Sequence, residues 1–442
     1  MKKVVVFSTL LFAGLIGSQL LPGAVGPRYA GLADAVRVLT MVGLSFIMIR
    51  VGFEFDIDKS NLGRYGWDYL VAFTAASLPW ILVSLYFVFA LLPSQAWSDA
   101  AAWKETLLAG RFAAPTSAGV LFSMLAAAGL GTTWLFRKAR ILAIFDDLDT
   151  VLLMIPLKML MVGLAWQLGL VVVVMLLMLS IGYAYLHKVR IPVTWPWVLG
   201  YAVAITALSE LIYTGSTLID ESVPIHVEVL LPAFVLGCIM AYPGADASAA
   251  GHGHEVVDTP SERRVSTVVA GVFMVLVGLS MPLILGGETA SQAAASLPKV
   301  EPSLHAAGQT SAEHLAFQSG QKQDIGRITA AQPPLSWRSI AVHVLLVTLI
   351  SNLGKMFPAF CYRKEATWRE RLAVAVGMWP RGEVGAGVLV ISLSYGIGGP
   401  IVTIAMLSLA LNLVLTGLFI YFVKRLTRPL PAYGDITLAT AE

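Results

Sequence analysis

The chain has 442 residues, of which 57% are hydrophobic and 13% charged, and its mean hydropathy is +0.77. Soluble domains are nearer half apolar and a quarter charged, so this composition predicts an all-α polytopic membrane protein. The net charge of +3 is too small to indicate a nucleic-acid partner. Both cysteines, Cys238 and Cys361, fall in apolar segments, so no disulfide framework is expected.

Twelve segments are long and apolar enough to cross a bilayer, which takes about 20 residues each. The first follows Met1-Lys-Lys and lacks a clear cleavage site, so it is interpreted as a span rather than a signal peptide. The fifth and sixth are separated only by Pro156-Leu-Lys158. The predicted spans are residues 4–22, 34–53, 68–92, 106–128, 139–157, 160–186, 194–214, 225–242, 265–286, 339–361, 371–395 and 401–423.

The positions of Lys and Arg predict the orientation in the membrane, because cytoplasmic loops carry an excess of them. With twelve spans, the basic residues at 137–140 and at 363–371 fall on the same side as Lys2 and Lys3. Both termini are therefore expected in the cytoplasm, including a short tail at residues 429–442. Residues 287–337, rich in Ala, Gln, Ser and Pro, are expected to form an external insertion.

Two adjacent acids, Asp146 and Asp147, lie inside the apolar fifth span. A charge near the bilayer centre costs roughly 2.5–3.5 kcal/mol on insertion scales, so such residues usually bind or move something charged. Counting along each helix from its basic end places Asp146 about 9 Å deep, Lys355 about 12 Å and Arg381 about 15 Å. One shared polar site is predicted. A purely structural ion pair is the alternative, although one lysine cannot neutralise two aspartates.

Two spans contain predicted helix breaks, since proline removes a helix hydrogen bond. Residues 113–119 read Ala-Ala-Pro-Thr-Ser-Ala-Gly, and residues 379–387 read Trp-Pro-Arg-Gly-Glu-Val-Gly-Ala-Gly. Each break is in the fourth span of a group of five, and the two groups enter the membrane from opposite sides. Broken helices at matching positions of inverted repeats indicate a transport site. The predicted repeats are residues 1–158 and 225–428, linked by two spans at 159–224.

Two motifs resemble the monovalent cation:proton antiporter superfamily, in particular bacterial electrogenic sodium/proton antiporters. They are Arg-Ile-Leu-Ala-Ile-Phe-Asp-Asp-Leu-Asp at residues 140–149 and Gly-Met-Trp-Pro-Arg-Gly-Glu-Val at 377–384. The likeness extends over residues 35–425. It implies the sodium/proton antiporter fold, with about twelve transmembrane helices, two inverted five-helix repeats and two crossed discontinuous helices. It also implies a homodimer in the bacterial inner membrane that is not an enzyme and has no cofactor.

The resemblance implies a role for each matching charged residue. Asp147 matches the carboxylate that binds the transported sodium ion or the proton. Asp146 matches the acid that contributes to this site and pairs with a lysine, and Lys355 stands at that lysine position. Arg381 and Glu383 match the charge-compensating or gating residues of the second broken helix.

The first broken helix departs from the family pattern. Thr116 and Ser117 stand where hydroxyl or carbonyl oxygens help to bind the ion, but the family's usual aspartate is Ser117 here. Asp149 and Arg111 are extra charges. They are expected either to pair with each other or to alter ion selectivity.

The expected function is exchange of a monovalent cation, most readily sodium, for protons by alternating access across the lipid bilayer. Two carboxylates in a site of low dielectric constant cannot both ionise cheaply, so a cation and a proton compete for Asp147. A two-proton cycle would use Lys355 or Asp146 for the second proton. A sodium-coupled solute symporter of similar fold and a potassium/proton exchanger remain open. An intramembrane aspartyl protease is disfavoured, because its two aspartates face each other from separate helices.

Overall fold

The computed structural model describes residues 2–26, 29–53, 55, 62–162, 166–217, 229–241, 260–281, 326–394 and 396–427. The tail at 429–442 and most of the expected insertion, residues 287–325, lie outside them. Within the described residues the chain is helical, with one isolated parallel β-bridge between Val189 and Met240. The helices are α1 (Lys2–Val25), α2 (Tyr29–Phe53), α3 (Leu62–Tyr86), α4 (Ala100–Gly110), α5 (Ala118–Ala127), α6 (Trp134–Val162), α7 (Trp166–Ala184), α8 (Trp195–Thr217), α9 (Leu230–Ile239), α10 (Pro260–Leu279), α13 (Arg327–Ala330), α14 (Trp337–Gly354), α15 (Phe357–Phe360), α16 (Trp368–Gly377), α17 (Glu383–Ser394) and α18 (Gly399–Leu426).

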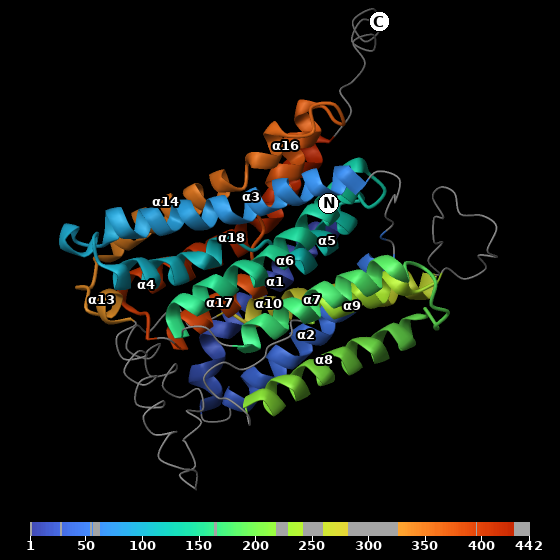
Figure 1. The fold of residues 1–442 in the computed structure, drawn as a ribbon, viewed down its shortest axis with the longest axis horizontal. Helices are drawn as coiled ribbons and strands as arrows, with labels where there is room; N and C mark the ends of the chain where they lie inside the picture. Colours follow the sequence, from blue (N-terminus) through green and yellow to red (C-terminus); the bar gives the residue numbers. More distant parts are fainter. Residues whose placement is uncertain are drawn as a thin grey trace, which may run out of the picture.

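The all-α class is confirmed, and each predicted span coincides with a helix or with a pair of shorter ones. Most of these helices run along the long axis of the molecule (Figure 1). α6, with 29 residues, has the length of a membrane span. It contains the acidic residues of the fifth predicted span. Among the residues that the structure describes, six helical segments combine the length and the hydropathy of a membrane span: Lys2–Val25, Gly31–Phe53, Tyr65–Leu91, Trp195–Ser216, Trp337–Phe360 and Gly399–Leu426.

One predicted helix boundary is wrong. The fifth span was expected to end near Pro156, but α6 continues through this proline to Val162. A proline inside a membrane helix costs one backbone hydrogen bond, and packing against neighbouring helices tolerates that loss. Residues 163–165, between the described ends of α6 and α7, lie outside the described residues.

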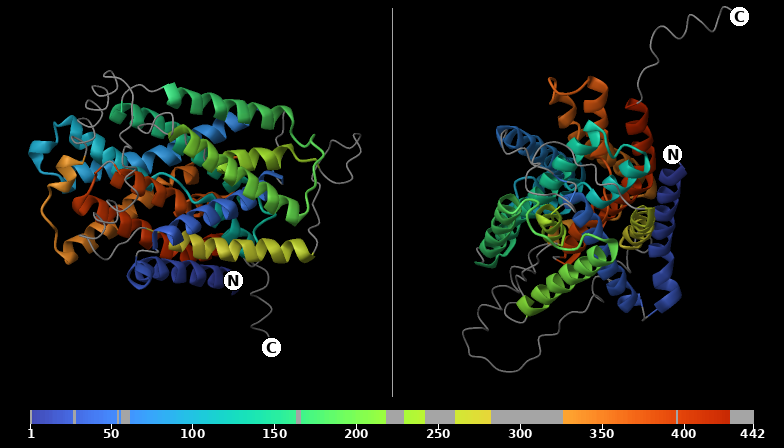
Figure 2. Two further views of the ribbon diagram at one scale, coloured as in Figure 1. Left: turned by 90° about the horizontal axis from the view of Figure 1, so that it is seen from below. Right: turned by 90° about the vertical axis from the view of Figure 1, so that its right-hand side faces the viewer.

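One group of helices is built on close backbone contacts between α1 and α10 and between α2 and α9. A side chain at Gly14 of α1 would overlap the carbonyl oxygen of Val275 on α10, and one at Gly52 of α2 would overlap that of Phe234 on α9. Figure 2 shows α1 and the yellow α10 side by side along one edge of the molecule. These two pairings, first span with ninth and second with eighth, are the ones that exchange when two inverted five-helix repeats are superimposed.

The second group contains α3, α6, α14 and α18, which pack on one another around the two broken helices. The first broken helix is α4 and α5, joined by a 3₁₀ turn at Arg111–Ala113 and an extended stretch. The second is α16 and α17, joined by residues 378–382. Both breaks are thus enclosed by continuous helices.

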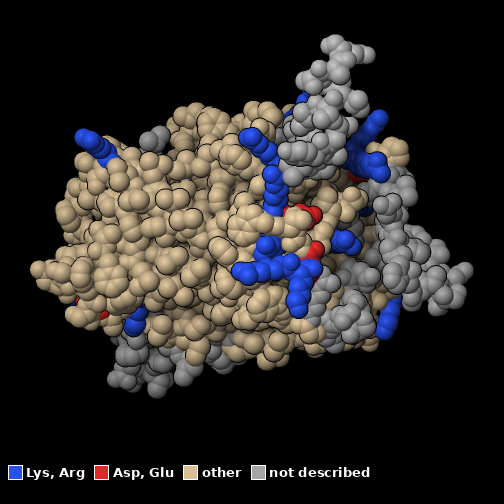
Figure 3. All heavy atoms as spheres, turned by 90° about the horizontal axis from the view of Figure 1, so that it is seen from above, with Lys and Arg blue, Asp and Glu red and all other residues tan. Residues whose placement is uncertain are grey.

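The surface matches a protein surrounded by lipid. Leu20, Leu211, Val268 and Leu345, on four different helices, are each at least 62% exposed. Figure 3 shows a broad face almost without charged side chains, with Lys and Arg gathered toward one end of the molecule. Exposed apolar side chains over such an area are costly in water and favourable against acyl chains.

A short segment near the end of the insertion is tied to the first broken helix. Glu105 of α4 is fully buried and accepts hydrogen bonds from the amides of Ile328 (3.2 Å) and Thr329 (2.8 Å) at the start of α13. Gly326, with φ of +88°, packs so tightly on Gly396 that a side chain there would overlap its carbonyl oxygen. The segment therefore bridges α4 and the loop before α18.

Glu105→Ala is expected to release this segment, because hydrogen bonds to a charged group are worth about 1.5–3 kcal/mol each. Amide hydrogen exchange at Ile328 and Thr329 should accelerate by roughly tenfold or more. Glu105→Gln keeps one acceptor oxygen and should show a smaller change. Unaltered exchange in the alanine variant would show that the Glu105 carboxylate does not hold the segment.

Candidate functional site

The acidic residues of α6 lie in its middle and are withdrawn from solvent. Asp146 and Asp149 are 0% exposed and Asp147 is 3% exposed. α6 is a continuous helix here, so Asp146 and Asp149 point to a common side and Asp147 points to a different one. Neighbours in the sequence therefore have different surroundings.

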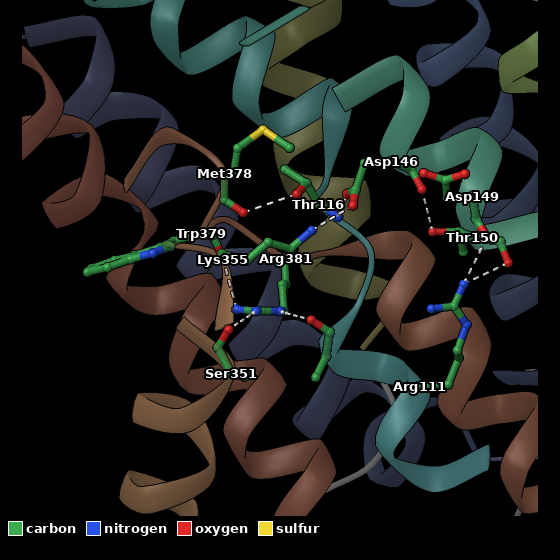
Figure 4. A network of polar contacts seen from close by, with 11 residues as sticks. Arg111, Thr116, Asp146, Asp149, Thr150, Ser351, Lys355, Met378, Trp379 and Arg381 are labelled. Atoms are coloured by element: carbon green, nitrogen blue, oxygen red, sulfur yellow. Dashed lines mark hydrogen bonds and ion pairs between the residues drawn. The ribbon is translucent and has the colours of Figure 1, made fainter. Parts of the chain in front are cut away.

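Asp146 is bound by two groups from other parts of the chain. Lys355, which caps the last turn of α14, donates from Nζ to Asp146 Oδ1 at 2.7 Å, and neither side chain is exposed. The amide of Thr116, in the first break, donates to Asp146 Oδ2 at 2.7 Å. Figure 4 shows both contacts converging on this carboxylate. The predicted Asp146–Lys355 contact is therefore present in the structure.

The two breaks touch each other directly. The amide of Ser117 donates to the carbonyl oxygen of Pro380 at 3.0 Å, and the Thr116 hydroxyl donates to that of Met378 at 3.0 Å. The Ser117 hydroxyl caps α5 by accepting from the amide of Val120 at 3.4 Å. Each break thus satisfies backbone groups that the other leaves without helical partners, which is what a membrane interior demands.

Arg381 holds the crossing together. Its guanidinium is fully buried and donates to the first break, to α14 and to α18. The acceptors are Ala113 O (3.0 Å), Ser351 O (3.0 Å), Asn352 Oδ1 (2.6 Å), Trp379 O (3.2 Å) and Asn412 Oδ1 (3.3 Å). Sequence reasoning missed the two asparagines, although an asparagine inside an apolar helix was a usable signal.

Glu383 is the first residue of α17, and its side chain lies outside the described part of the structure. Its predicted gating role is therefore not tested. Lys355 makes its ion pair with Asp146 rather than with the neighbouring Asp147. It nevertheless lies in the electrostatic field of both aspartates and of Arg381.

Arg111 and Asp149 lie close together but do not pair through the carboxylate. Arg111 Nη2 donates to the carbonyl oxygens of Asp149 (3.2 Å) and Thr150 (3.0 Å). The Asp149 carboxylate faces the hydroxyl of Tyr69 on α3 and lies in the field of Arg111, but it accepts no hydrogen bond of good geometry. The interaction expected between these residues is therefore electrostatic at short range, with the direct contact made to the backbone.

These contacts give the two neighbouring acids different chemistry. Asp146 is neutralised by Lys355 and fixed by a backbone amide, so its carboxylate is held in place. Asp147 follows it on α6 and is also withdrawn from solvent. Oxygen ligands suit hard cations such as sodium. The arrangement can present one buried carboxylate either to a small cation or to a proton.

The fold and this polar crossing define a class of protein, the membrane transporters with paired discontinuous helices. The family model described as "Sodium/hydrogen exchanger, transmembrane" matches residues 3–398, and the chain belongs to this family. The solved structure of the sodium proton antiporter MjNhaP1 from Methanocaldococcus jannaschii is similar, with a TM-score of 0.50 and 15% sequence identity over 93% of this chain and 92% of that chain. No curated protein matches the chain.

These findings confirm the predicted superfamily and the antiporter fold. They make the chain a cation/proton antiporter by family, and an integral membrane protein. The roles assigned to individual residues, the transported ion and the repeat boundaries stay predictions.

Proposed function

We propose that the chain exchanges sodium for protons by alternating access, with Asp147 as the carboxylate that carries either ion. The observation that carries this proposal is a pair of adjacent buried acids in the middle of α6, one of which is bound at the crossing of the two breaks. Lys355 and the Thr116 amide bind Asp146. Sodium is chosen first because the family's description names it.

Exchange follows from competition at one site. A proton and a cation each cancel the charge of Asp147, and binding of one disfavours the other. The site is then exposed to the opposite side of the membrane with one ion or the other bound. Exposing it there while it is empty and negatively charged would be costly. Oxygens of Thr116 and Ser117 are suited to complete the coordination of the cation, with Asp146 next to it.

Alternating access requires one group of helices to move relative to another group that stays in place. The structure has two groups of helices, and the residues proposed for the ion site belong to the group of α3, α6, α14 and α18 with the broken helices. We propose that this group moves against α1, α2, α9 and α10, exposing the site first on one side and then on the other. In this proposal the repeats are residues 1–158 and 225–428, and two copies form a dimer in an inner membrane with both termini in the cytoplasm.

The test is collapse of a pH gradient in proteoliposomes that contain the purified protein. Sodium, lithium and potassium are added separately, and the internal pH is followed with a fluorescent dye. Proton movement on adding sodium is the expected result. A response to potassium alone would favour a potassium/proton exchanger. No proton movement with any cation, together with sodium-dependent solute uptake, would favour the symporter and contradict the proposal.

A further inference from the structure

Arg111 connects the first broken helix to the acidic helix at a point away from the two acids. It lies in the 3₁₀ turn that ends α4, and its side chain is 0% exposed. Its Nη2 donates to the carbonyl oxygens of Asp149 and Thr150, and its guanidinium carbon lies 4.7 Å from the centre of the Trp80 ring. Figure 4 shows these contacts on the far side of Asp146 from Lys355.

The same break is fixed to α6 a second time, five residues further along the chain. There the Thr116 amide donates to Asp146. On α6, Asp146 and the carbonyls of Asp149 and Thr150 are about one turn apart, or roughly 5 Å along the axis. The stretch from Arg111 to Thr116 is therefore clamped to one helix at both of its ends, and its register along α6 is set by two contacts.

We propose that Arg111 is a positioning residue for the cation site. Building on the proposed function, this assigns Arg111 the role of holding the Thr116–Ser117 oxygens at the correct distance from Asp146 and Asp147. Without this clamp the Arg111 end of the break loses its hydrogen bonds to α6 while the Thr116 end keeps its own, and the oxygens shift along the helix. Hard cations are discriminated by the size and rigidity of their oxygen cage, so affinity and selectivity depend on this register.

The local chemistry fits a clamp better than a charge for the ion. A guanidinium presents several planar donors, and here one nitrogen reaches two successive carbonyl oxygens while the plane covers an aromatic ring. The Asp149 side chain also lies in the electrostatic field of Arg111. The Thr150 hydroxyl in turn donates to the carbonyl oxygen of Asp146 at 2.8 Å, which joins the clamp to the backbone of the acid.

The test compares Arg111→Gln and Arg111→Lys in the proteoliposome assay, with cation concentration varied for sodium and lithium. Loss of groups that orient ion ligands typically lowers ion affinity by about 10–100-fold. Both variants are expected to raise the apparent KM for sodium by about tenfold or more, to change the sodium-to-lithium KM ratio, and to leave the maximal rate within about threefold. Lysine keeps the charge but not the planar donors, so it separates position from charge.

Arg371→Gln is the matched control. Arg371 also donates to a backbone carbonyl, that of Cys361 at 3.2 Å, and lies over an aromatic ring, Trp368 at 5.3 Å, but it lies in the first turn of α16, at the end of this helix away from the second break. Its KM for sodium should equal that of the wild type.

Three results would overturn the inference: a KM within about twofold of wild type in either Arg111 variant, a maximal rate that falls while KM stays constant, or an equal rise of KM in Arg371→Gln. If an Arg111 variant fails to fold, Trp80→Leu removes the ring beneath the guanidinium, and an unchanged KM there overturns the inference as well. Wild-type protein without any cation/proton exchange would contradict the proposed function instead, so the two failures are distinguishable.

Discussion

Replacing Asp147 by asparagine is expected to abolish cation-dependent proton movement while leaving the protein folded. Asparagine has nearly the same volume as aspartate but cannot ionise, so it can neither release a proton nor offer a full negative charge to a cation. Asp146 keeps its contacts to Lys355 and to the Thr116 amide in this variant, because neither involves the Asp147 side chain. The rate of pH-gradient collapse in proteoliposomes measures the effect directly.

The control for this substitution is Asp34→Asn, which makes the same chemical change at an exposed position on α2. Its exchange rate should match the wild type. Sodium-dependent exchange that survives in Asp147→Asn would remove Asp147 from the ion site and leave Asp146 as the carrier. A normal elution profile and thermal unfolding curve would show that loss of transport is not loss of the fold.

The long-range outline of the fold could be predicted because hydropathy and charge position are local properties. The apolar runs fixed the helices, and Pro115 and Pro380 located both breaks to within a few residues. The end of α6 could not be predicted in the same way. Pro156 is an equally strong local signal, yet the helix continues through it to Val162, because a membrane helix can tolerate the loss of one backbone hydrogen bond.

Some contacts of the candidate site could likewise be predicted from the sequence, and others could not. A contact between Lys355 and the acid pair was predictable, since opposite charges at similar depth in a membrane compensate each other, and the family resemblance assigned that contact to Asp146. Contacts to the backbone were not predictable: the Thr116 amide on Asp146, or the binding of Arg111 to carbonyl oxygens instead of to the Asp149 carboxylate. Every residue carries the same backbone groups, so the sequence gives no sign of which one is used.

The hydrogen-bond partners of Arg381 differ from those that its place in an apolar segment suggests. An arginine in an apolar helix suggests an acid nearby, but its hydrogen bonds go to neutral oxygens, including the side chains of Asn352 and Asn412. Neutral acceptors solvate the guanidinium and leave its charge uncancelled. That charge acts on Asp146, together with the charge of Lys355. Two buried cations therefore act on the acid pair, one in direct contact with Asp146 and one held at the crossing by neutral acceptors.

Replacing Lys355 by methionine is expected to cause the largest loss of stability among the substitutions considered. Methionine fills a similar volume without the charge, so the variant leaves the Asp146 carboxyl group fully buried without its ion-pair partner. Breaking a buried ion pair from one side typically costs about 3–5 kcal/mol. Thermal unfolding of the purified protein in detergent should begin at a clearly lower temperature, and exchange should slow.

A double substitution separates the ion pair from the individual residues. Asp146→Asn alone should destabilise the protein much as Lys355→Met does, because it leaves the lysine charge buried without its partner. The combination of the two removes both charges, and buried pairs replaced as a whole are often neutral in stability. The double variant is therefore expected to unfold at a higher temperature than either single variant while exchange stays impaired. If the two losses simply add, Lys355 and Asp146 do not stabilise each other, and the lysine acts on the site through other groups.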